Sequence, residues 1–177
     1  IFVFYPGKAG GAFIKQYAQA GLQGKIPLYS VFTVDSIALP KLQKANMSGV
    51  MGSVMTQFWA PDLDTPQNKK FVSGFKKKYG RYPSFYAAQS YDTIFLIKSA
   101  VEAVKGDLSN IDGMRAAMKT ANFPSVRGKF SYGNNHFPIQ NFYSRKVVKD
   151  SEGVWTTSVQ EVVLKNHQDT YAKDCSM

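Results

Sequence analysis

The chain has 177 residues and a formal net charge of +10, and 44% of its residues are hydrophobic. This length and composition fit one globular domain or two small ones and exclude a disordered chain. The single cysteine, Cys175, excludes an intrachain disulfide, and with only two histidines the sequence predicts no metal site.

The first residues predict a β-α-β unit. Residues 1–5 form an unbroken apolar run, and after a Pro/Gly loop Phe13, Ile14 and Tyr17 recur on one face at helical spacing. Gly21 is the residue type preferred just past a helix end. An unbroken apolar strand is typical of a parallel sheet whose two faces are covered by helices. The predicted fold class is therefore α/β.

The loop after this strand is the first candidate for a binding site, because open α/β sheets bind ligands beyond the carboxyl ends of their strands. Tyr5, Pro6 and Gly7 stand at that edge. The glycines of the Gly7–Gly11 loop follow neither the G-x-G-x-x-G nor the Walker spacing, so the phosphate-loop signal is weak. Backbone N–H groups at the start of the following helix can still bind an anion such as a carboxylate.

Two further strands are predicted in the first third. Residues 28–33 form a second apolar run at the spacing that a crossover helix imposes. A helix over residues 37–45 follows, with Asp35 in the cap region. Residues 49–56, rich in small and β-favouring residues, predict the third strand.

The regular alternation of strand and helix stops at residues 57–61. Predicted helices over residues 66–79, 84–104 and 111–121 follow; the first begins after Thr65 and ends at Gly80, and Ser84 opens the second. The longest of them has few polar residues before Lys98, so we expect it to be buried on most sides.

The last third returns to strands. Residues 125–132 alternate like a half-exposed strand, and residues 133–138 form a loop. Residues 141–148 and 154–163 predict a hairpin around the turn at 150–153.

Candidates for catalysis are few. Neither histidine lies in a nucleophile–base motif, and a structural hydrogen bond is the favoured role of His136. Three aromatic residues, Tyr5, Phe32 and Trp59, fall near predicted strand ends. They fit both a pocket wall and core packing, and both interpretations stay open. The residues by themselves therefore form no recognisable catalytic motif.

The basic charge raises the hypothesis of a nucleic-acid-binding protein. The lysines are spread from Lys8 to Lys173, and the densest run, 76–78, ends a predicted helix. The aromatic residues also lack the pattern of a stacking platform. A solvated helix face is the favoured interpretation, and no nucleic-acid partner is predicted.

Several motifs stand in an informative order along nearly the whole chain. They are Tyr5-Pro-Gly…Gly11-x-x-Ile-Lys-Gln…Ala-Gly21-Leu, Phe75-x-x-Lys-Tyr-Gly-x-x-Pro83, Tyr86-Ala-Ala-x-x-Tyr91-Asp92 and Val126-Arg-Gly-x-Phe130…Asn135-His-Phe-Pro-Ile-Gln140. Their order resembles the solute-binding proteins of branched-chain amino acid type ABC transporters, which are type I periplasmic binding proteins.

This resemblance implies two lobes that close on a small ligand and are joined by three crossings. It assigns residues 1–57 to the C-terminal lobe, 58–136 to the helical portion of the N-terminal lobe, and 137–177 to strands that return to the C-terminal lobe. It also implies an N-terminal segment of comparable length before residue 1. We therefore expect the chain to be an incomplete fragment whose missing segment carries the Ser/Thr loops for the ligand's carboxylate.

The resemblance also implies a ligand site. Its residues are Tyr5, Pro6, Gly7, Phe32 and Thr33, to which the aromatic pattern adds Trp59. Members that bind amino acids place an acidic residue near the second strand end, where this chain has Phe32. A buried ammonium group without a carboxylate partner is costly. An aromatic or apolar acid is therefore favoured over an amino acid as the ligand, although branched aliphatic acids and amino acids remain alternatives.

The implied function is that of the periplasmic, or otherwise extracytoplasmic, substrate-binding component of an ABC importer. It captures a small carboxylate by hinge closure and docks on the membrane permease, without a cofactor. The alternative is a doubly wound α/β enzyme with a phosphate or nucleotide at the Gly7–Gly11 loop. That enzyme needs an acidic residue for the ribose at the end of the second strand, where Phe32 and Thr33 stand.

Overall fold

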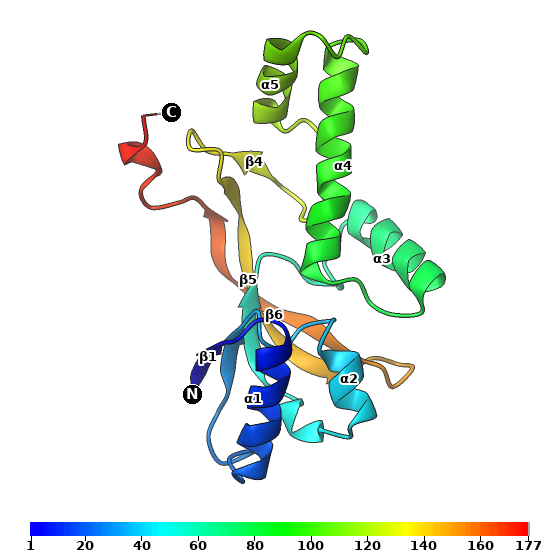
Figure 1. Ribbon diagram of the computed structural model, residues 1–177, viewed down its shortest axis with the longest axis vertical. Helices are drawn as coiled ribbons and strands as arrows, with labels where there is room; N and C mark the ends of the chain where they lie inside the picture. The colour runs from blue at the N-terminus through cyan, green and yellow to red at the C-terminus, as the bar shows by residue number, and fades with distance from the viewer. Residues whose placement is uncertain (177) are drawn as a thin grey trace.

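The computed structural model describes residues 1–176 as an elongated molecule with strands along its centre (Figure 1). The strands are β1 (Phe2–Phe4), β2 (Tyr29–Val31), β3 (Val54–Gln57), β4 (Ser131–Tyr132), β5 (Pro138–Lys149) and β6 (Trp155–His167). The helices are α1 (Lys8–Gln19), α2 (Leu39–Lys44), α3 (Pro66–Tyr79), α4 (Phe85–Ala103) and α5 (Ile111–Thr120), with short 3₁₀ turns at Ser48–Val50 and Ala172–Asp174. None of the described helices combines the length and the hydropathy that a membrane span requires.

The sheet has the order β1-β2-β3-β5-β4, and β6 pairs with β5. β1, β2 and β3 are parallel, as the sequence predicts, with Val3 opposite Ser30. β5 runs antiparallel to β3 and forms with β6 the predicted hairpin, which is longer than expected. The result is a mixed sheet flanked by helices, which confirms the α/β fold class.

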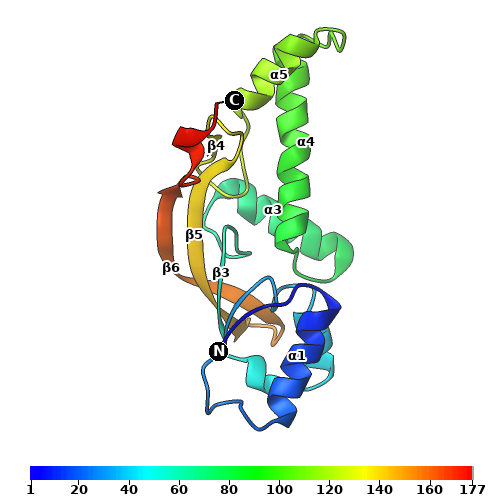
Figure 2. The same ribbon diagram turned by 60° about the vertical axis from the view of Figure 1, so that its left-hand side comes forward.

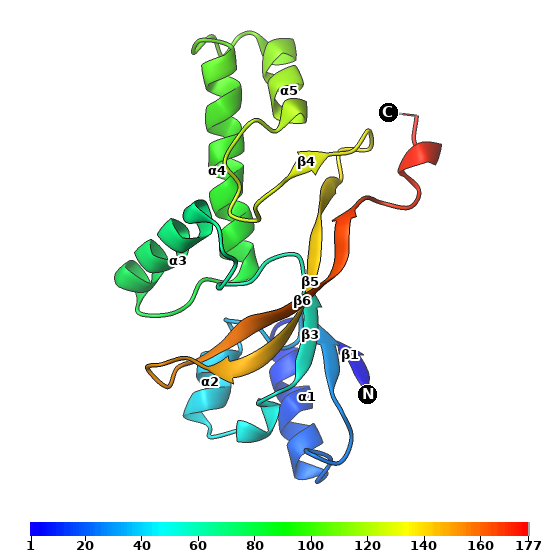
Figure 3. The same cartoon turned by 180° about the vertical axis from the view of Figure 1, so that it is seen from behind.

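Helices α1 and α2 pack on the same face of the parallel strands (Figures 2 and 3). Ile14 of α1 and Leu39 of α2 are 1% and 0% exposed and share a core with Val3. On the opposite face of β1, Phe2 and Phe4 are 72% and 58% exposed. The expectation that helices cover both faces of this strand is therefore wrong for the described residues, because none of their helices packs on that second face.

A second core lies above the first, between α3, α4 and the hairpin. Trp59, Phe71, Phe85 and Val126 are its central buried side chains. Two helix starts have the predicted chemistry, since the side chain of Thr65 caps α3 and that of Ser84 caps α4.

Two predicted strands are shorter in the structure. Within residues 49–56 only the last part pairs, because a 3₁₀ turn and Gly52, with a φ of 75°, interrupt the extended backbone. Within residues 125–132 only Ser131 and Tyr132 pair, because the backbone N–H of Val126 donates to the carboxylate of Asp92 and not to a neighbouring strand.

The longest helix is also less buried than predicted. Ile94 and Ile97 of α4 are 64% and 44% exposed, and Asp92 is among its few buried residues. These two apolar side chains therefore face solvent in the part of the chain that the structure describes. The prediction of burial on most sides is therefore wrong for the described chain.

The hairpin connects the two cores. We call residues 1–57 the sheet part and residues 58–136 the helical part. At its start β5 pairs with β4 of the helical part, where Ile139 lies opposite Ser131. Further along, Tyr143 of the same strand lies opposite Gln57 of β3 in the sheet part. A single strand thus runs from one part into the other (Figure 2).

Candidate functional site

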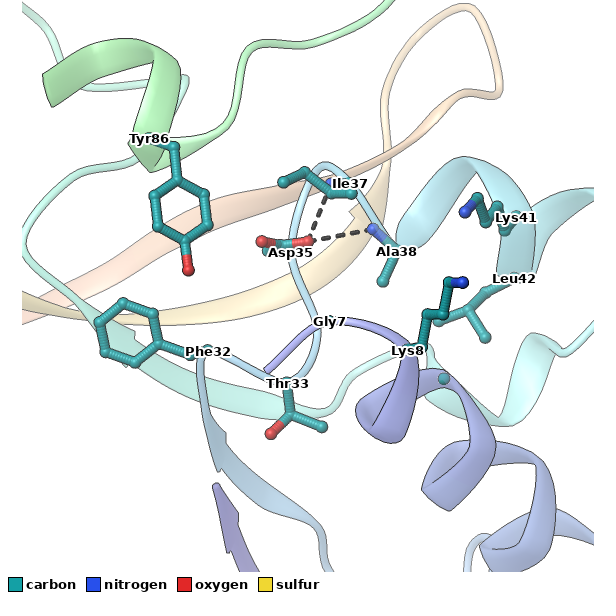
Figure 4. A pocket seen from close by; sticks show the side chains of 11 residues that line it. Gly7, Lys8, Phe32, Thr33, Asp35, Ile37, Ala38, Lys41, Leu42 and Tyr86 are labelled. Carbon is teal, nitrogen blue, oxygen red and sulfur yellow. Dashed lines mark hydrogen bonds between the residues drawn. The ribbon is translucent and has the colours of Figure 1, made fainter. Parts of the chain in front are cut away.

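A pocket of about 360 Å³ lies at the carboxyl ends of β1 and β2, between the start of α1, α2 and the start of α4 (Figure 4). It is lined by Gly7, Lys8, Gly11, Phe32, Thr33, Asp35, Ile37, Ala38, Lys41, Leu42 and Tyr86. This is the edge of the sheet at which open α/β folds bind ligands. Its size suits a small organic molecule.

The first strand is followed by a sharp turn that directs the N-terminus of α1 toward the pocket. Gly7 has a φ of 70°, a conformation that strains other residue types. A Cβ on Gly10 would overlap the carbonyl oxygen of Tyr5 and lie 3.0 Å from that of Thr33. The glycines therefore allow the helix to start directly against the ends of both strands.

Thr33 joins these two strand ends. It is 2% exposed, and its Oγ1 accepts a hydrogen bond of 2.9 Å from the backbone N–H of Tyr5. Its hydroxyl lies 3.1 Å from the carbonyl oxygen of Val31, to which it donates. The hydroxyl group thus fixes the first pocket loop against the second, and the rest of the side chain lines the cavity.

Phe32 joins the sheet part to the helical part. Its ring lies 4.8 Å from that of Phe85 in α4 and 5.7 Å from that of Phe4, measured between centroids. Its φ is 56°, a left-handed value that costs a bulky residue of the order of 1–3 kcal/mol. The surrounding aromatic packing holds this conformation and places the ring on the pocket wall.

Positive charge dominates one end of the pocket. In Figure 4 the ammonium groups of Lys8 and Lys41 lie on the side away from Tyr86 and Phe32. Neither lysine has an ion-pair partner within residues 1–176. The first N–H groups of α1, which begins at Lys8, add the partial positive charge of a helix N-terminus.

Asp35, the one acidic residue of the lining, already binds backbone N–H groups of its own loop. The Oδ1 atom of Asp35 accepts hydrogen bonds of 2.8 and 3.0 Å from the backbone N–H groups of Ile37 and Ala38. This turn replaces the predicted first helical turn, so α2 starts only at Leu39.

Arg145 of β5 adds a buried positive charge whose field reaches Asp35. The guanidinium is 4% exposed and donates to Thr157 Oγ1 at 3.2 Å. Burial lowers the pKa of Arg145 to about 10, and the charges of Asp35 and Asp62 partly offset that decrease. Arg145 is therefore still a cation at neutral pH and opposes the charge of Asp35. The lysines keep the pocket electropositive.

The structure brings together three of the six predicted site residues, Gly7, Phe32 and Thr33, in the pocket lining. Tyr5 and Pro6 directly precede Gly7 in the chain but do not line the pocket. The half-exposed ring of Tyr5 lies 5.7 Å from that of Phe13, measured between centroids. Trp59 lies elsewhere. It is 1% exposed in the core of the helical part.

Trp59 has a structural partner there. Its Nε1 donates to Asn68 Oδ1 at 2.8 Å, and the Nδ2 group of Asn68 donates to the backbone carbonyl oxygens of Pro61 and Leu63. Of the two interpretations left open for the aromatic residues, core packing describes the position of Trp59 and the pocket wall that of Phe32.

Among the lining residues that the sequence did not predict, four have polar side chains: Lys8, Asp35, Lys41 and Tyr86. Lys8 was within reach, because it is the first residue of a helix that starts at the predicted ligand loop. Tyr86 opens one of the motifs of the family resemblance, but nothing local predicts its pocket position, since only the tertiary fold brings α4 over the end of β2. Within residues 1–176 no three His, Cys, Asp or Glu side chains are grouped to hold a metal ion.

Residues 1–152 match the family described as periplasmic binding protein. The match covers most of the chain, so this chain belongs to the periplasmic binding protein family. The predicted resemblance is thereby confirmed.

The chain is similar to Leu/Ile/Val-binding protein homolog 6 of Brucella abortus (strain 2308), with 29% identity over 161 residues. That alignment covers 88% of this chain and 40% of the relative, so the chain spans well under half of its relative's length.

Several solved structures of solute-binding proteins are also similar to this chain. A solute-binding protein of an ABC transporter from R. palustris, in complex with benzoate, is 30% identical with a TM-score of 0.83, over 99% of this chain and 46% of that one. One from Rhodopseudomonas palustris BisB5, in complex with 3,4-dihydroxybenzoic acid, is 30% identical with a TM-score of 0.77, over 93% and 45%. The leucine-binding protein LivK of Thermotoga maritima, at 22% identity and a TM-score of 0.69 over 92% and 43%, shares the fold. These relatives are transport components and not enzymes.

Proposed function

We propose that this chain is part of the extracytoplasmic substrate-binding component of an ABC importer, and that its pocket binds a small carboxylate. The observation that carries the proposal is that Lys8, Lys41 and the N-terminus of α1 lie together at one end of a mostly apolar pocket. Such a site suits a carboxylate on an apolar body. The proposal includes no catalytic step.

The aromatic end of the pocket favours an aromatic acid among the carboxylates. Phe32 and Tyr86 lie opposite the lysines and offer ring surfaces and one hydroxyl group. The benzoate and dihydroxybenzoate in two similar solute-binding proteins support the same class. Branched aliphatic acids and amino acids remain alternatives, and Asp35 is the lining residue that would accept the ammonium group of an amino acid.

The mechanism follows from the origin of the lining residues. Tyr86 belongs to the helical part, whereas Lys8, Phe32 and Lys41 belong to the sheet part. A ligand that contacts both parts stabilises the arrangement in which they are close together. The closed form would then dock on the permease in the membrane. The division into lobes at residues 57–58 and 136–137, and the contribution of a further N-terminal segment to the site, belong to this proposal.

Calorimetry with matched ligands tests the proposal. Benzoate and 4-hydroxybenzoate should bind, and benzamide, which has nearly the same shape but no charge, should bind far more weakly. Leucine should bind more weakly than benzoate. A ligand present at about 1,000 times its Kd stabilises the folded protein by roughly 4 kcal/mol, so thermal unfolding gives an independent reading.

Two results would contradict the proposal. Equal binding of benzoate and benzamide would remove the role of the carboxylate. Binding of a nucleotide such as AMP, without binding of any carboxylate, would instead support a phosphate site at the Gly7–Gly11 loop and the enzyme alternative.

A further inference from the structure

The turn between β5 and β6 is organised so that one acidic oxygen points away from it. The Oδ1 atom of Asp150 accepts hydrogen bonds of 2.9 and 2.8 Å from the N–H groups of Glu152 and Val154. Gly153 takes a φ of 78° in this turn. The Oδ2 atom makes no bond within the turn and is available to a partner outside it.

That partner comes from the helical part. The hydroxyl of Tyr82, in the connection between α3 and α4, donates to Asp150 Oδ2 at 2.8 Å. Lys76 Nζ of α3 lies 4.5 Å from the centroid of the Tyr82 ring, 3.7 Å from Asp150 Oδ2 and 3.5 Å from Glu152 Oε2. We call this group the Tyr82–Asp150 bridge. The Asp150 side chain is only 14% exposed there.

The same turn is attached to the sheet part. The Nε2 group of Gln43 in α2 donates to the carbonyl oxygen of Gly153 at 2.9 Å, and Gln43 Oε1 accepts from the N–H of Trp155 at 2.9 Å. The turn therefore links α2 on one side to Tyr82 on the other. It does so with directed hydrogen bonds and not with apolar contact alone.

The bridge and the pocket connect the same two segments. Lys41 and Leu42 of α2 line the pocket, and Gln43 follows them directly. Tyr86 lines the pocket from the first turn of α4, one turn after Tyr82. A ligand in the pocket and the bridge beside it therefore favour the same approach of α2 to the start of α4.

We propose that the Tyr82–Asp150 bridge holds the helical part against the sheet part before any ligand binds, and thereby sets the ligand affinity from outside the pocket. Since the binding-competent arrangement is already populated, less of the binding free energy is used to reach it. Tyr82 and Asp150 are positioning residues in this scheme, because neither lines the pocket. Burial and donation to Asp150 raise the pKa of the Tyr82 hydroxyl, so it remains the proton donor at neutral pH. The effect on affinity rests on the proposed function, whereas the effect on the ligand-free state does not.

Distances between spin labels test the bridge directly. Labels on cysteines introduced at Lys44 of α2 and Gln89 of α4, both exposed, report on the separation of the two parts in a Cys175→Ser background. Tyr82→Phe removes one hydroxyl and keeps the ring under Lys76. Tyr79→Phe is the matched control, because Tyr79 is 53% exposed at the end of α3 and lies outside the bridge.

Without ligand, Tyr82→Phe should add longer distances to the distribution, while Tyr79→Phe should match the unmodified protein. Lys76→Met, which keeps a long side chain over the ring, should have a smaller effect in the same direction. If benzoate binds, Tyr82→Phe should weaken its binding by about three- to tenfold, the range expected for one hydrogen bond. Saturating ligand should restore the short distance.

Identical distance distributions for Tyr82→Phe and Tyr79→Phe would overturn the proposal, even if the ligand class were correct. Failure of every carboxylate to bind would instead reject the proposed function, and the distances would still decide on the bridge.

Discussion

Arg127 and Asp92 form a buried ion pair that fixes the segment after α5 to the middle of α4. Arg127 Nε donates to Asp92 Oδ2 at 2.9 Å, and the two side chains are 7% and 1% exposed. Ser125 Oγ and the N–H of Val126 donate to the same carboxylate, and Arg127 also donates to Gln140 at the start of β5. Two motifs on which the family resemblance rests are thus parts of one network.

Removal of one partner of this pair should destabilise the protein strongly. Arg127→Met leaves the carboxylate of Asp92 buried without its cation, at a cost of about 3–5 kcal/mol in the free energy of unfolding. Chemical denaturation measures this loss. The double variant Arg127→Met/Asp92→Leu should be more stable than Arg127→Met alone, because it leaves no buried charge. If the losses in the free energy of unfolding of Arg127→Met and Asp92→Leu simply add up in the double variant, the two residues act independently.

The start of α1 offers a matched pair of glycines. Gly10→Ala places a methyl group against the Tyr5 carbonyl and should destabilise the protein by about 1–3 kcal/mol. Gly11→Ala, one residue further along the same helix, meets no atom within 4 Å and should stabilise it by about 0.5–1 kcal/mol. Thermal unfolding of both variants measures these opposite changes in stability. Equal shifts of the unfolding midpoint would mean that the close approach of α1 to the strand ends is not rigid.

The two pocket lysines should differ from their neighbours in ligand binding. Lys8→Met and Lys41→Met should each weaken benzoate binding by about three- to tenfold, a modest effect because both side chains are exposed. Lys44→Met, on α2 but outside the pocket lining, is the control. Calorimetry at low and high salt should show that the loss shrinks as salt screens the charges. An equal loss in the control would point to the overall basic charge.

Asp35 tests the choice between aromatic acids and amino acids. Asp35→Asn keeps the oxygen that accepts the Ile37 and Ala38 N–H groups but removes the negative charge. Benzoate affinity should stay unchanged or rise. If the ligand is an amino acid, the same variant should lose most of its binding, because the ammonium group would have no anionic partner in the pocket.

Trp59 should affect stability and not binding. Trp59→Phe removes the hydrogen bond to Asn68 and leaves unfilled space in the core, which should reduce the free energy of unfolding by about 2–4 kcal/mol. Benzoate affinity should not change at a temperature at which the variant is folded. A loss of affinity without a loss of stability would identify Trp59 as the ligand contact that the sequence suggested.

Local patterns predicted most of the helices and strands, because apolar periodicity and capping residues act within one segment. The glycine that ends α3, Gly80 in the left-handed conformation, and the caps Thr65 and Ser84 are examples. The same patterns failed where a distant partner decides. Asp92 draws Val126 away from a strand, and Tyr86 reaches the pocket only through the position of α4.

The burial of α4 could not be predicted for a related reason. Its apolar residues are compatible with a fully covered helix, but coverage depends on what else packs against them. In the described chain Ile94 and Ile97 remain in contact with solvent.

The continuity of β5 determines what kind of motion the molecule can make. A joint made only of loops would allow the two parts to swivel freely in any direction. Here a hydrogen-bonded two-stranded ribbon crosses the joint, with register irregularities at Gln140, Phe142 and Ser144 where it passes from one part to the other. Such irregularities increase local twist. The easiest deformation is therefore twisting of the β5–β6 ribbon about its own axis. We expect this twist to rotate the helical part over the pocket.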